Sequence, residues 1–302
     1  KLIQMKFYSN GKLLITGEYA VLNGALSLAI PSKFGQYLDI SENSTQFIYW
    51  KSKNRDDKVW FECKISIKNL NVEETTSNEI SNRLVKIISL IKEYNPSFLN
   101  KTGSKISTKL TFDKNWGLGS SSTLISNLSK LANVDPYIIN SKIFKGSGYD
   151  IACANSNSPI LYKIKKTERT IKETNFNPIF KNKIYFVFLN KKQSSLAEIK
   201  RYKSLKPSNL ILSEISDITL RISNCKNEIE FIDLISSHEK IISKLISKKP
   251  IKDILFKDFK GEIKSLGAWG GDFILTISQD DPSSYFRSKG YNIIFKYQEL
   301  LA

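Results

Sequence analysis

The 302-residue sequence has one histidine, one methionine and three cysteines. Cys63, Cys153 and Cys225 lie far apart and show no CxxC or Cys/His spacing, so neither a disulfide framework nor a zinc site is indicated. No apolar run approaches the roughly 18 to 20 residues of a membrane span, and no secretion signal pattern opens the chain. We therefore expect a soluble, cytoplasmic protein with reduced thiols and no membrane partner.

Arginine is also scarce. Lysine and arginine together number 46 against 29 acidic residues, a formal net charge of +17, but only six of the 46 are arginines. Proteins that bind nucleic acid more often cluster arginine with aromatic residues on one face, whereas lysine is spread along this whole chain. We expect no nucleic-acid partner.

Apolar periodicity predicts an α+β fold. Hydrophobic residues make up 41% of the chain, enough for a real core, and the length favours two domains. Alternating or continuous apolar runs predict strands at residues 11–15, 26–30, 61–67, 106–112, 160–164 and 184–189. Helical spacing predicts helices over 80–91, after the serines at 120–122, and from Pro136, which follows an N-cap Asp135.

The second half of the chain reads as strand, helices, strand, strand, helix, strand. Residues 165–183 are polar and are predicted to form a linker, which places two domains at residues 5–170 and 171–302. Ser195 and Glu198 have the spacing of a capping box for the helix that follows the strand at 184–189.

Lys12 stands inside an apolar strand, in the segment Asn10 to Leu22. A partly buried ammonium needs an anionic partner or loses its charge, so Lys12 indicates a nearby carboxylate or phosphate. The alternative is an edge-strand lysine whose stem is buried while its ammonium reaches water.

A glycine- and serine-rich loop precedes the predicted helix near residue 124. Residues 115–123 read Asn-Trp-Gly-Leu-Gly-Ser-Ser-Ser-Thr. Free N–H groups at a helix start, glycines that allow close approach and hydroxyls that bond a phosphate or a metal together predict an anion site. The alternative, a serine-capped helix after a tight turn, explains one serine well and three poorly. The loop is not a Walker A motif.

Two further glycine-rich segments carry acidic residues. Residues 145–152, Lys-Gly-Ser-Gly-Tyr-Asp-Ile-Ala, deliver Asp150, which could take a proton from an attacking hydroxyl or pair with Lys12. Residues 266–272, Leu-Gly-Ala-Trp-Gly-Gly-Asp, lie between two predicted strands and could bring backbone N–H groups to an anion or form a plain hairpin turn.

In this order, the segments 10–24, 117–123 and 267–272 resemble the three motifs of the GHMP kinase superfamily. The resemblance covers most of the chain, and Gly-Leu-Gly-Ser-Ser is its most specific part. It implies an N-terminal domain like ribosomal protein S5 domain 2 and a ferredoxin-like C-terminal domain, with ATP and Mg²⁺ bound between them.

The resemblance also implies roles for individual residues. Asp150 would be the catalytic carboxylate, with Lys12 beside it to neutralise charge as the γ-phosphoryl group moves. Ser121 would provide the hydroxyl at Mg²⁺. Residues expected to hold the ATP phosphates are Gly117, Leu118, Gly119, Ser120, Ser121 and Ser122. Candidate substrate contacts are Glu18, Tyr19, Lys192, Ser194, Gly270 and Gly271.

Several positions depart from the family pattern. Asn10 replaces a proline, Trp116 stands where glycine or alanine is commoner, and Trp269 interrupts the usual glycine run. The stretch 138–141 lacks the acidic metal ligand of mevalonate kinases. His238 falls on an apolar helical stripe, and we interpret it as a residue at the edge of the core and not as a catalytic base.

The segments around Tyr19 and Asp150 are most similar to phosphomevalonate kinases, whereas the chain length is nearer to that of mevalonate kinases. The expected activity is ATP- and Mg²⁺-dependent phosphorylation of mevalonate or phosphomevalonate, a small-molecule substrate. Alternatives are a lyase similar to mevalonate diphosphate decarboxylase, which shares the fold but lacks the Asp150 loop, and a noncatalytic relative that binds a nucleotide or RNA. Formation of a homodimer stays open.

Overall fold

A computed structural model of the chain describes residues 4–144, 146–192 and 195–301. The chain divides into two compact units, neither of them one continuous stretch of sequence. Unit 1 comprises the residues up to Gly11 together with Phe34–Lys114 and Leu118–Asn155. Unit 2 comprises Lys12–Lys33, Asn115–Gly117 and the residues from Ser156 onward. No single cut in the sequence separates them, because β1 (Gln4–Leu14) and β2 (Ser27–Asn43) each contribute to both.

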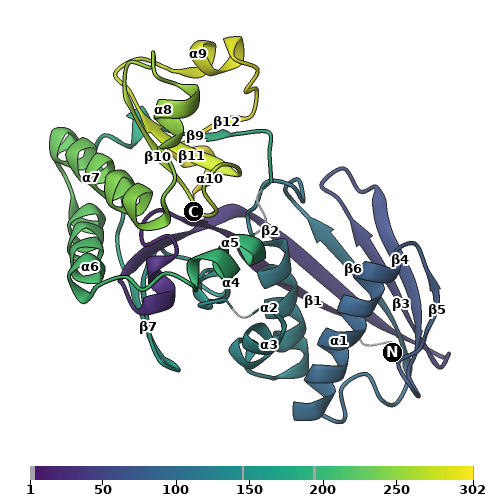
Figure 1. Cartoon of the computed structure of the whole chain (residues 1–302). Helices are drawn as coiled ribbons and strands as arrows, with labels where there is room; N and C mark the ends of the chain where they lie inside the picture. The colour runs from purple at the N-terminus through teal and green to yellow at the C-terminus, as the bar shows by residue number, and fades with distance from the viewer. Residues whose placement is uncertain (1–3, 145, 193–194, 302) are drawn as a thin grey trace. The chain divides into compact units, whose positions relative to one another are not determined.

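Unit 1 is built on strands that carry helices on one face (Figure 1). Beside the outer part of β2 its strands are β3 (Phe47–Lys53), β4 (Val59–Ser66), β5 (Val72–Thr75) and β6 (Gly103–Leu110). They run in the order β5-β4-β3-β6-β2, and only the β3–β6 pair is parallel. The helices are α1 (Asn78–Tyr94), α2 (Ser120–Ala132), α3 (Pro136–Ile143) and α4 (Tyr149–Ala154).

The core of unit 1 follows from the apolar periodicity. In β4 every second residue is buried, and in α1 Leu84, Ile87, Ile88 and Ile91 form one buried stripe. These side chains share a single core cluster with residues of α2 such as Leu128. The predicted cap of α3 is confirmed, because the Asp135 carboxylate accepts a hydrogen bond from the Tyr137 N–H at 2.8 Å.

Unit 2 contains the second sheet. Its elements before the second sheet are the 3₁₀ helix η1 (Ala20–Asn23), the hairpin β7 (Ile160–Lys165) and β8 (Glu168–Glu173), and the 3₁₀ helix η2 (Lys181–Lys183). The sheet has the order β10-β11-β9-β12, with β9 (Ile184–Phe188), β10 (Glu262–Ser265), β11 (Phe273–Ile277) and β12 (Ile294–Lys296), and every pairing is antiparallel.

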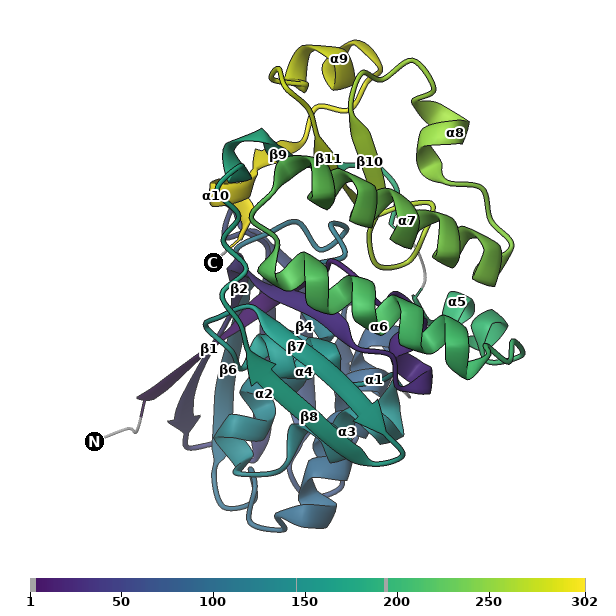
Figure 2. The ribbon, with the colours of Figure 1, turned by 90° about the vertical axis from the view of Figure 1, so that its left-hand side faces the viewer.

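Helices lie between and after the strands of this sheet in the sequence, as the periodicity of the second half predicts. They are α5 (Ser195–Tyr202), α6 (Asn209–Asn224), α7 (Glu228–Ile246), α8 (Ile251–Leu255), α9 (Ser283–Ser288) and α10 (Tyr297–Leu300). Figure 2 shows α6 and α7 side by side, with α7 packed on β10. All five residues of β9 are buried, which confirms the deeply buried strand expected there.

The predicted linker over residues 165–183 is wrong in part, because Glu168–Glu173 forms β8 and pairs along its whole length with β7. β8 is an edge strand whose residues are mostly exposed, so it lacks the apolar alternation that marks a half-buried strand. The predicted boundary between residues 170 and 171 lies inside this hairpin of unit 2.

Candidate active site

Lys12 and Gly117 meet in unit 2. Lys12 lies near the end of β1, is half-buried, and donates a hydrogen bond through Nζ to the backbone oxygen of Gly117 at 3.0 Å. Its ammonium is therefore fixed at the first glycine of the predicted phosphate loop. The alternative was a lysine whose ammonium reaches only water. Lys12 does not fit it, because its ammonium is bonded to the protein backbone.

The carboxylate of Asp272 packs against the same glycine. A Cβ atom added to Gly117 would lie 2.4 to 2.6 Å from the carboxylate atoms of Asp272, and Gly117 has a positive φ of 71°. Asp272 is itself buried and ends the third motif segment. No role is predicted for Asp272 from the sequence, where its place after two glycines is the only signal.

The start of α2 leaves its first-turn amides without a side-chain cap. The N-cap residue is Gly119, in the left-handed conformation with a φ of 90°, and no side chain caps the helix. The Ser122 hydroxyl points back and donates to the Gly119 oxygen at 2.8 Å, whereas Ser121 is exposed. The interpretation of these serines as ordinary caps is therefore wrong, and the uncapped N–H groups are suited to an anion.

Asp150 belongs to the first turn of α4 in unit 1. Gly148, with a φ of 93°, is the N-cap of this helix, and the Asp150 side chain is half-buried. Helix α4 packs on α2, and the Ser126 hydroxyl of α2 donates to the Asn155 side-chain oxygen at 2.7 Å. The structure thus anchors the helix of the predicted base to the helix of the serine loop. Because Lys12 belongs to unit 2, its place beside Asp150 stays a prediction.

Tyr19 forms part of an aromatic wall in unit 2. It has an unusual φ of 60°, and its ring centroid lies 5.5 Å from that of Tyr202. Both tyrosines share a buried cluster with Trp269. The tryptophan that interrupts the glycine run is thus only 2% exposed and packs as core, which joins the first and third motif segments.

Glu18 is fully buried and pairs with a base that sequence analysis missed. Its Oε1 accepts a hydrogen bond from Lys264 Nζ, and neither side chain is exposed to solvent. Burial raises the pKa of Glu18, and the Lys264 charge opposes that rise. His238 is also fully buried beside this pair and is not at the edge of the core as expected.

In unit 2, the segment that contains Gly270 and Gly271 lies beside the segment that contains Lys192. The Asp272 N–H donates to the Lys191 oxygen at 2.7 Å, which places Gly270 and Gly271 beside the segment of Lys192. Lys192 and Gly270 are exposed. Ser194 lies outside the described residues, as does the Ser195 side chain of the predicted capping box, while Glu198 accepts from Lys248 Nζ at 2.7 Å.

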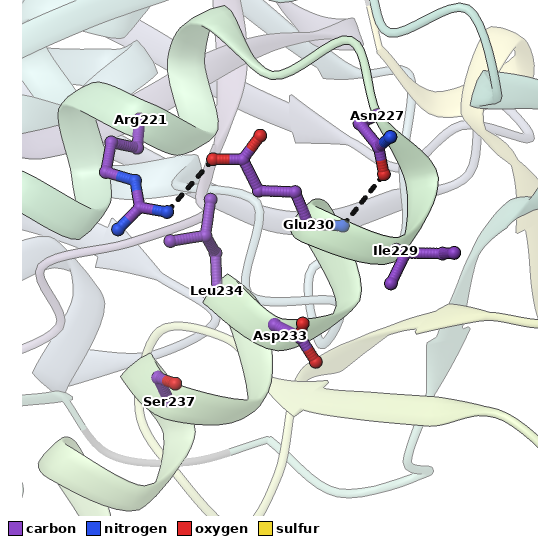
Figure 3. A pocket seen from close by; sticks show the side chains of 7 residues that line it. All are labelled: Arg221, Asn227, Ile229, Glu230, Asp233, Leu234 and Ser237. Atoms are coloured by element: carbon purple, nitrogen blue, oxygen red, sulfur yellow. Dashed lines mark hydrogen bonds and ion pairs between the residues drawn. The ribbon is translucent and has the colours of Figure 1, made fainter.

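A hollow of about 470 Å³ lies at the start of α7 (Figure 3). Its charged groups are largely used within the protein, since Arg221 pairs with Glu230 at 3.0 Å and the Glu230 N–H is bonded by Asn227. No candidate site residue lines it, so we assign it no part in the site.

Within the described residues, no group of three or more His, Cys, Asp or Glu side chains is arranged to hold a metal ion. Mg²⁺ commonly keeps several waters and binds through one or two carboxylates together with substrate phosphates. The exposed Ser121 hydroxyl at an uncapped helix start therefore fits a magnesium ion that arrives with a nucleotide. The described residues do not form a metal site made of protein ligands alone.

The fold is that of known small-molecule kinases. The chain superposes on Methanococcus jannaschii mevalonate kinase with a TM-score of 0.71 and 18% identity, covering 97% of each chain. It superposes on Streptococcus pneumoniae phosphomevalonate kinase, solved with phosphomevalonate and AMPPNP, with a TM-score of 0.69 and 16% identity over 94% of this chain and 95% of that one. For Lactococcus lactis galactokinase with galactose the values are 0.61 and 15%, over 94% and 88%.

No protein-family model and no curated protein sequence matches the chain. The structural likeness confirms the α+β fold expected from the motif resemblance. The identities are only 15 to 18%, and the neighbours include kinases solved with phosphomevalonate and with galactose, so the likeness defines the fold and not the activity of this chain.

Proposed function

We propose that the protein is a small-molecule kinase that uses ATP and Mg²⁺ to phosphorylate mevalonate or phosphomevalonate. The observation that carries this proposal is the bond from Lys12 to Gly117 at the head of a loop whose helix has no side-chain cap. The Lys12 ammonium is bonded to Gly117, and Gly117 lies two residues before Gly119, the N-cap of the helix with the uncapped N–H groups. Both features suit the binding of a phosphate.

In this proposal the loop from Gly117 to Ser122 holds the nucleotide phosphates through backbone N–H groups. Ser121 provides a hydroxyl to Mg²⁺, which when bound neutralises phosphate charge. Asp150 accepts the proton of the acceptor hydroxyl. The hydroxyl oxygen of the acceptor then forms a bond to the γ-phosphorus, while the bond between the γ-phosphorus and the oxygen that leaves with ADP breaks. Lys12 compensates the charge that develops on the transferred group.

The acceptor site in this proposal is formed by residues of unit 2. Tyr19, Gly270, Gly271 and Lys192 line it, and the exposed Lys192 ammonium would pair with an acceptor carboxylate or phosphate. Glu18 shapes the site from within the core and does not contact the acceptor, because its carboxylate is fully buried.

A cytoplasmic location belongs to the same proposal. All three cysteines are buried and none of them forms a disulfide, which agrees with a reducing compartment. None of the helices formed by the described residues has the length and apolar character needed to cross a lipid bilayer.

The test is ADP release by the purified protein with Mg²⁺ and ATP, offered mevalonate, 5-phosphomevalonate or galactose, with each product identified by mass. We expect turnover of one of the first two. Turnover of galactose alone would reject the mevalonate-pathway assignment. Carbon dioxide release from mevalonate diphosphate would indicate the lyase, and ATP binding without any turnover would indicate the noncatalytic relative.

A further inference from the structure

Four buried ionisable side chains meet inside unit 2. Glu18, Lys264 and His238 are fully buried, and Glu239 is 3% exposed. They come from three segments, namely the turn after β1, helix α7 and strand β10. Buried charges are costly unless they are paired and hydrogen-bonded, so their arrangement is informative.

The turn after β1 is held at two successive residues. Lys264 donates to Glu18 Oε1 and also to the Ser265 backbone oxygen, the latter at 2.9 Å. The Gly17 N–H donates to His238 Nε2 at 2.9 Å, and that nitrogen lies 3.6 Å from Glu18 Oε2. A nitrogen that accepts this bond belongs to a neutral ring, and burial and the Lys264 charge hold the pKa of His238 well below its ordinary range.

Helix α7 is tied to β10 by the residue that follows His238. Glu239 accepts hydrogen bonds from both the N–H and the hydroxyl of Ser265, at 3.0 and 2.7 Å. The glycine-rich segment 267–272 begins two residues after Ser265. One hydrogen-bonded network therefore fixes both Glu18, the residue before Tyr19, and Ser265, which lies just before the glycine-rich segment.

We propose that Lys264 and Glu18 are positioning residues for the acceptor site, holding Tyr19 and the loop of Trp269 in one relative arrangement. This inference rests on the proposed function for the identity of that site. Replacing a buried ion pair by apolar side chains of similar volume often preserves or raises stability. Apolar side chains would not impose the fixed hydrogen-bond directions that the pair gives to the turn and to Ser265.

The decisive variant is the double substitution Glu18→Met/Lys264→Met, which removes both charges together. We expect its melting temperature to recover most of what each single substitution loses. We expect its KM for the acceptor to stay at least tenfold above the wild-type value, with the KM for ATP changed less than threefold. Hydrogen exchange of segments 17–25 and 266–272 should stay at least tenfold faster than in the wild type.

The matched control is Thr276→Val in the neighbouring strand β11. Thr276 is fully buried, and its hydroxyl has no hydrogen-bond partner among the described residues. This variant should keep the wild-type KM values and exchange rates. A double variant with wild-type KM and wild-type exchange would overturn the proposal and leave the network a purely structural feature.

Should the double variant not fold, Glu18→Gln provides the test, because it keeps the volume of the side chain and an oxygen that can accept from Lys264 but removes the charge of the pair. Segments 17–25 and 266–272 should then exchange at least threefold faster, and unchanged exchange would again reject the proposal. Exchange is measured on the protein alone. A wild-type protein that shows no turnover would thus reject the kinase proposal while the exchange result still decides whether the network positions the two segments.

Discussion

Lys12 bonds the backbone oxygen of Gly117 at 3.0 Å, although 105 positions separate the two residues in the chain. The lysine of the first motif thus holds the first glycine of the second. Asp272 of the third motif packs on the same glycine. Three segments that were singled out separately in the sequence therefore converge on one backbone position in unit 2.

The first prediction concerns Lys12→Met, which keeps most of the apolar stem and removes the ammonium. We expect kcat to fall by about 10² to 10³, because a preorganised charge at the transferring group is lost. The melting temperature should change by only a few degrees. Lys12→Arg keeps a positive charge and should lose less activity, and a Met variant within tenfold of the wild-type kcat would remove Lys12 from the mechanism.

Asp150→Asn tests the proposed base. We expect kcat to fall by roughly 10² to 10⁴, the usual contribution of a positioned general base, while calorimetry shows ADP affinity unchanged within threefold. Asp217→Asn changes the net charge by the same amount at an exposed position of α6 and should leave kcat unaltered. Loss of ADP binding in the Asp150 variant would argue that the residue shapes the nucleotide site instead.

Gly117→Ala tests the close approach of Asp272. The added methyl group would overlap the Asp272 carboxylate, and the φ of 71° is strained for alanine. We expect unfolding in urea to show a loss of about 1 to 3 kcal/mol, together with weaker ADP binding. Gly146→Ala is the control in another glycine-rich loop, because nothing lies within 4 Å of its added Cβ atom. Equal stability of the two variants would contradict the structure at Gly117.

Local patterns predicted the elements well. Apolar periodicity located α1 and the buried β9, and the Asp135-Pro136 pair located the start of α3. Such signals depend on residues a few positions apart, so the sequence carries them directly. Strand β8 was not predicted, because a strand at an exposed sheet edge has no alternation of apolar and polar residues.

The buried network could not be predicted in the same way. Lys264 and Glu18 are 246 positions apart, and a lysine in a short strand carries no local signal of a buried partner. His238 was correctly placed on an apolar helical stripe, but its bond to the Gly17 backbone depends on tertiary packing. Which side chains meet is decided by the packing of α7 on β10, and periodicity within one element does not reveal it.

The last prediction is a pH dependence of stability that arises from Glu239. Burial raises the pKa of Glu239 from 4.5 to about 8 in the folded protein. Between these two values the folded chain keeps a proton that the unfolded chain has lost, so stability is full at low pH and decreases as pH rises toward 8. Burial also raises the pKa of Glu18, so Glu18 likewise makes the protein less stable as pH rises.

His238 acts in the opposite sense and in another window. Its pKa lies well below 6.5 in the folded protein, so its contribution is present above pH 6.5 and is lost as pH falls below that value. In the range from pH 6.5 to 8 the unfolded histidine loses most of its proton, so the carboxyl groups dominate the pH dependence there. Urea unfolding across this range should show the wild type losing about 1 to 2 kcal/mol, since one proton contributes up to about 1.4 kcal/mol per pH unit.

Glu239→Gln removes the titrating group and keeps an acceptor oxygen for Ser265. We expect its free energy of unfolding to change by less than about half as much as that of the wild type over the same range. Glu214→Gln, at an exposed position of α6, should keep the wild-type slope. If the Glu239 variant also keeps that slope, the proton taken up between pH 8 and 6.5 binds elsewhere, and Glu18, the other buried carboxyl group of the network, becomes the site to substitute next.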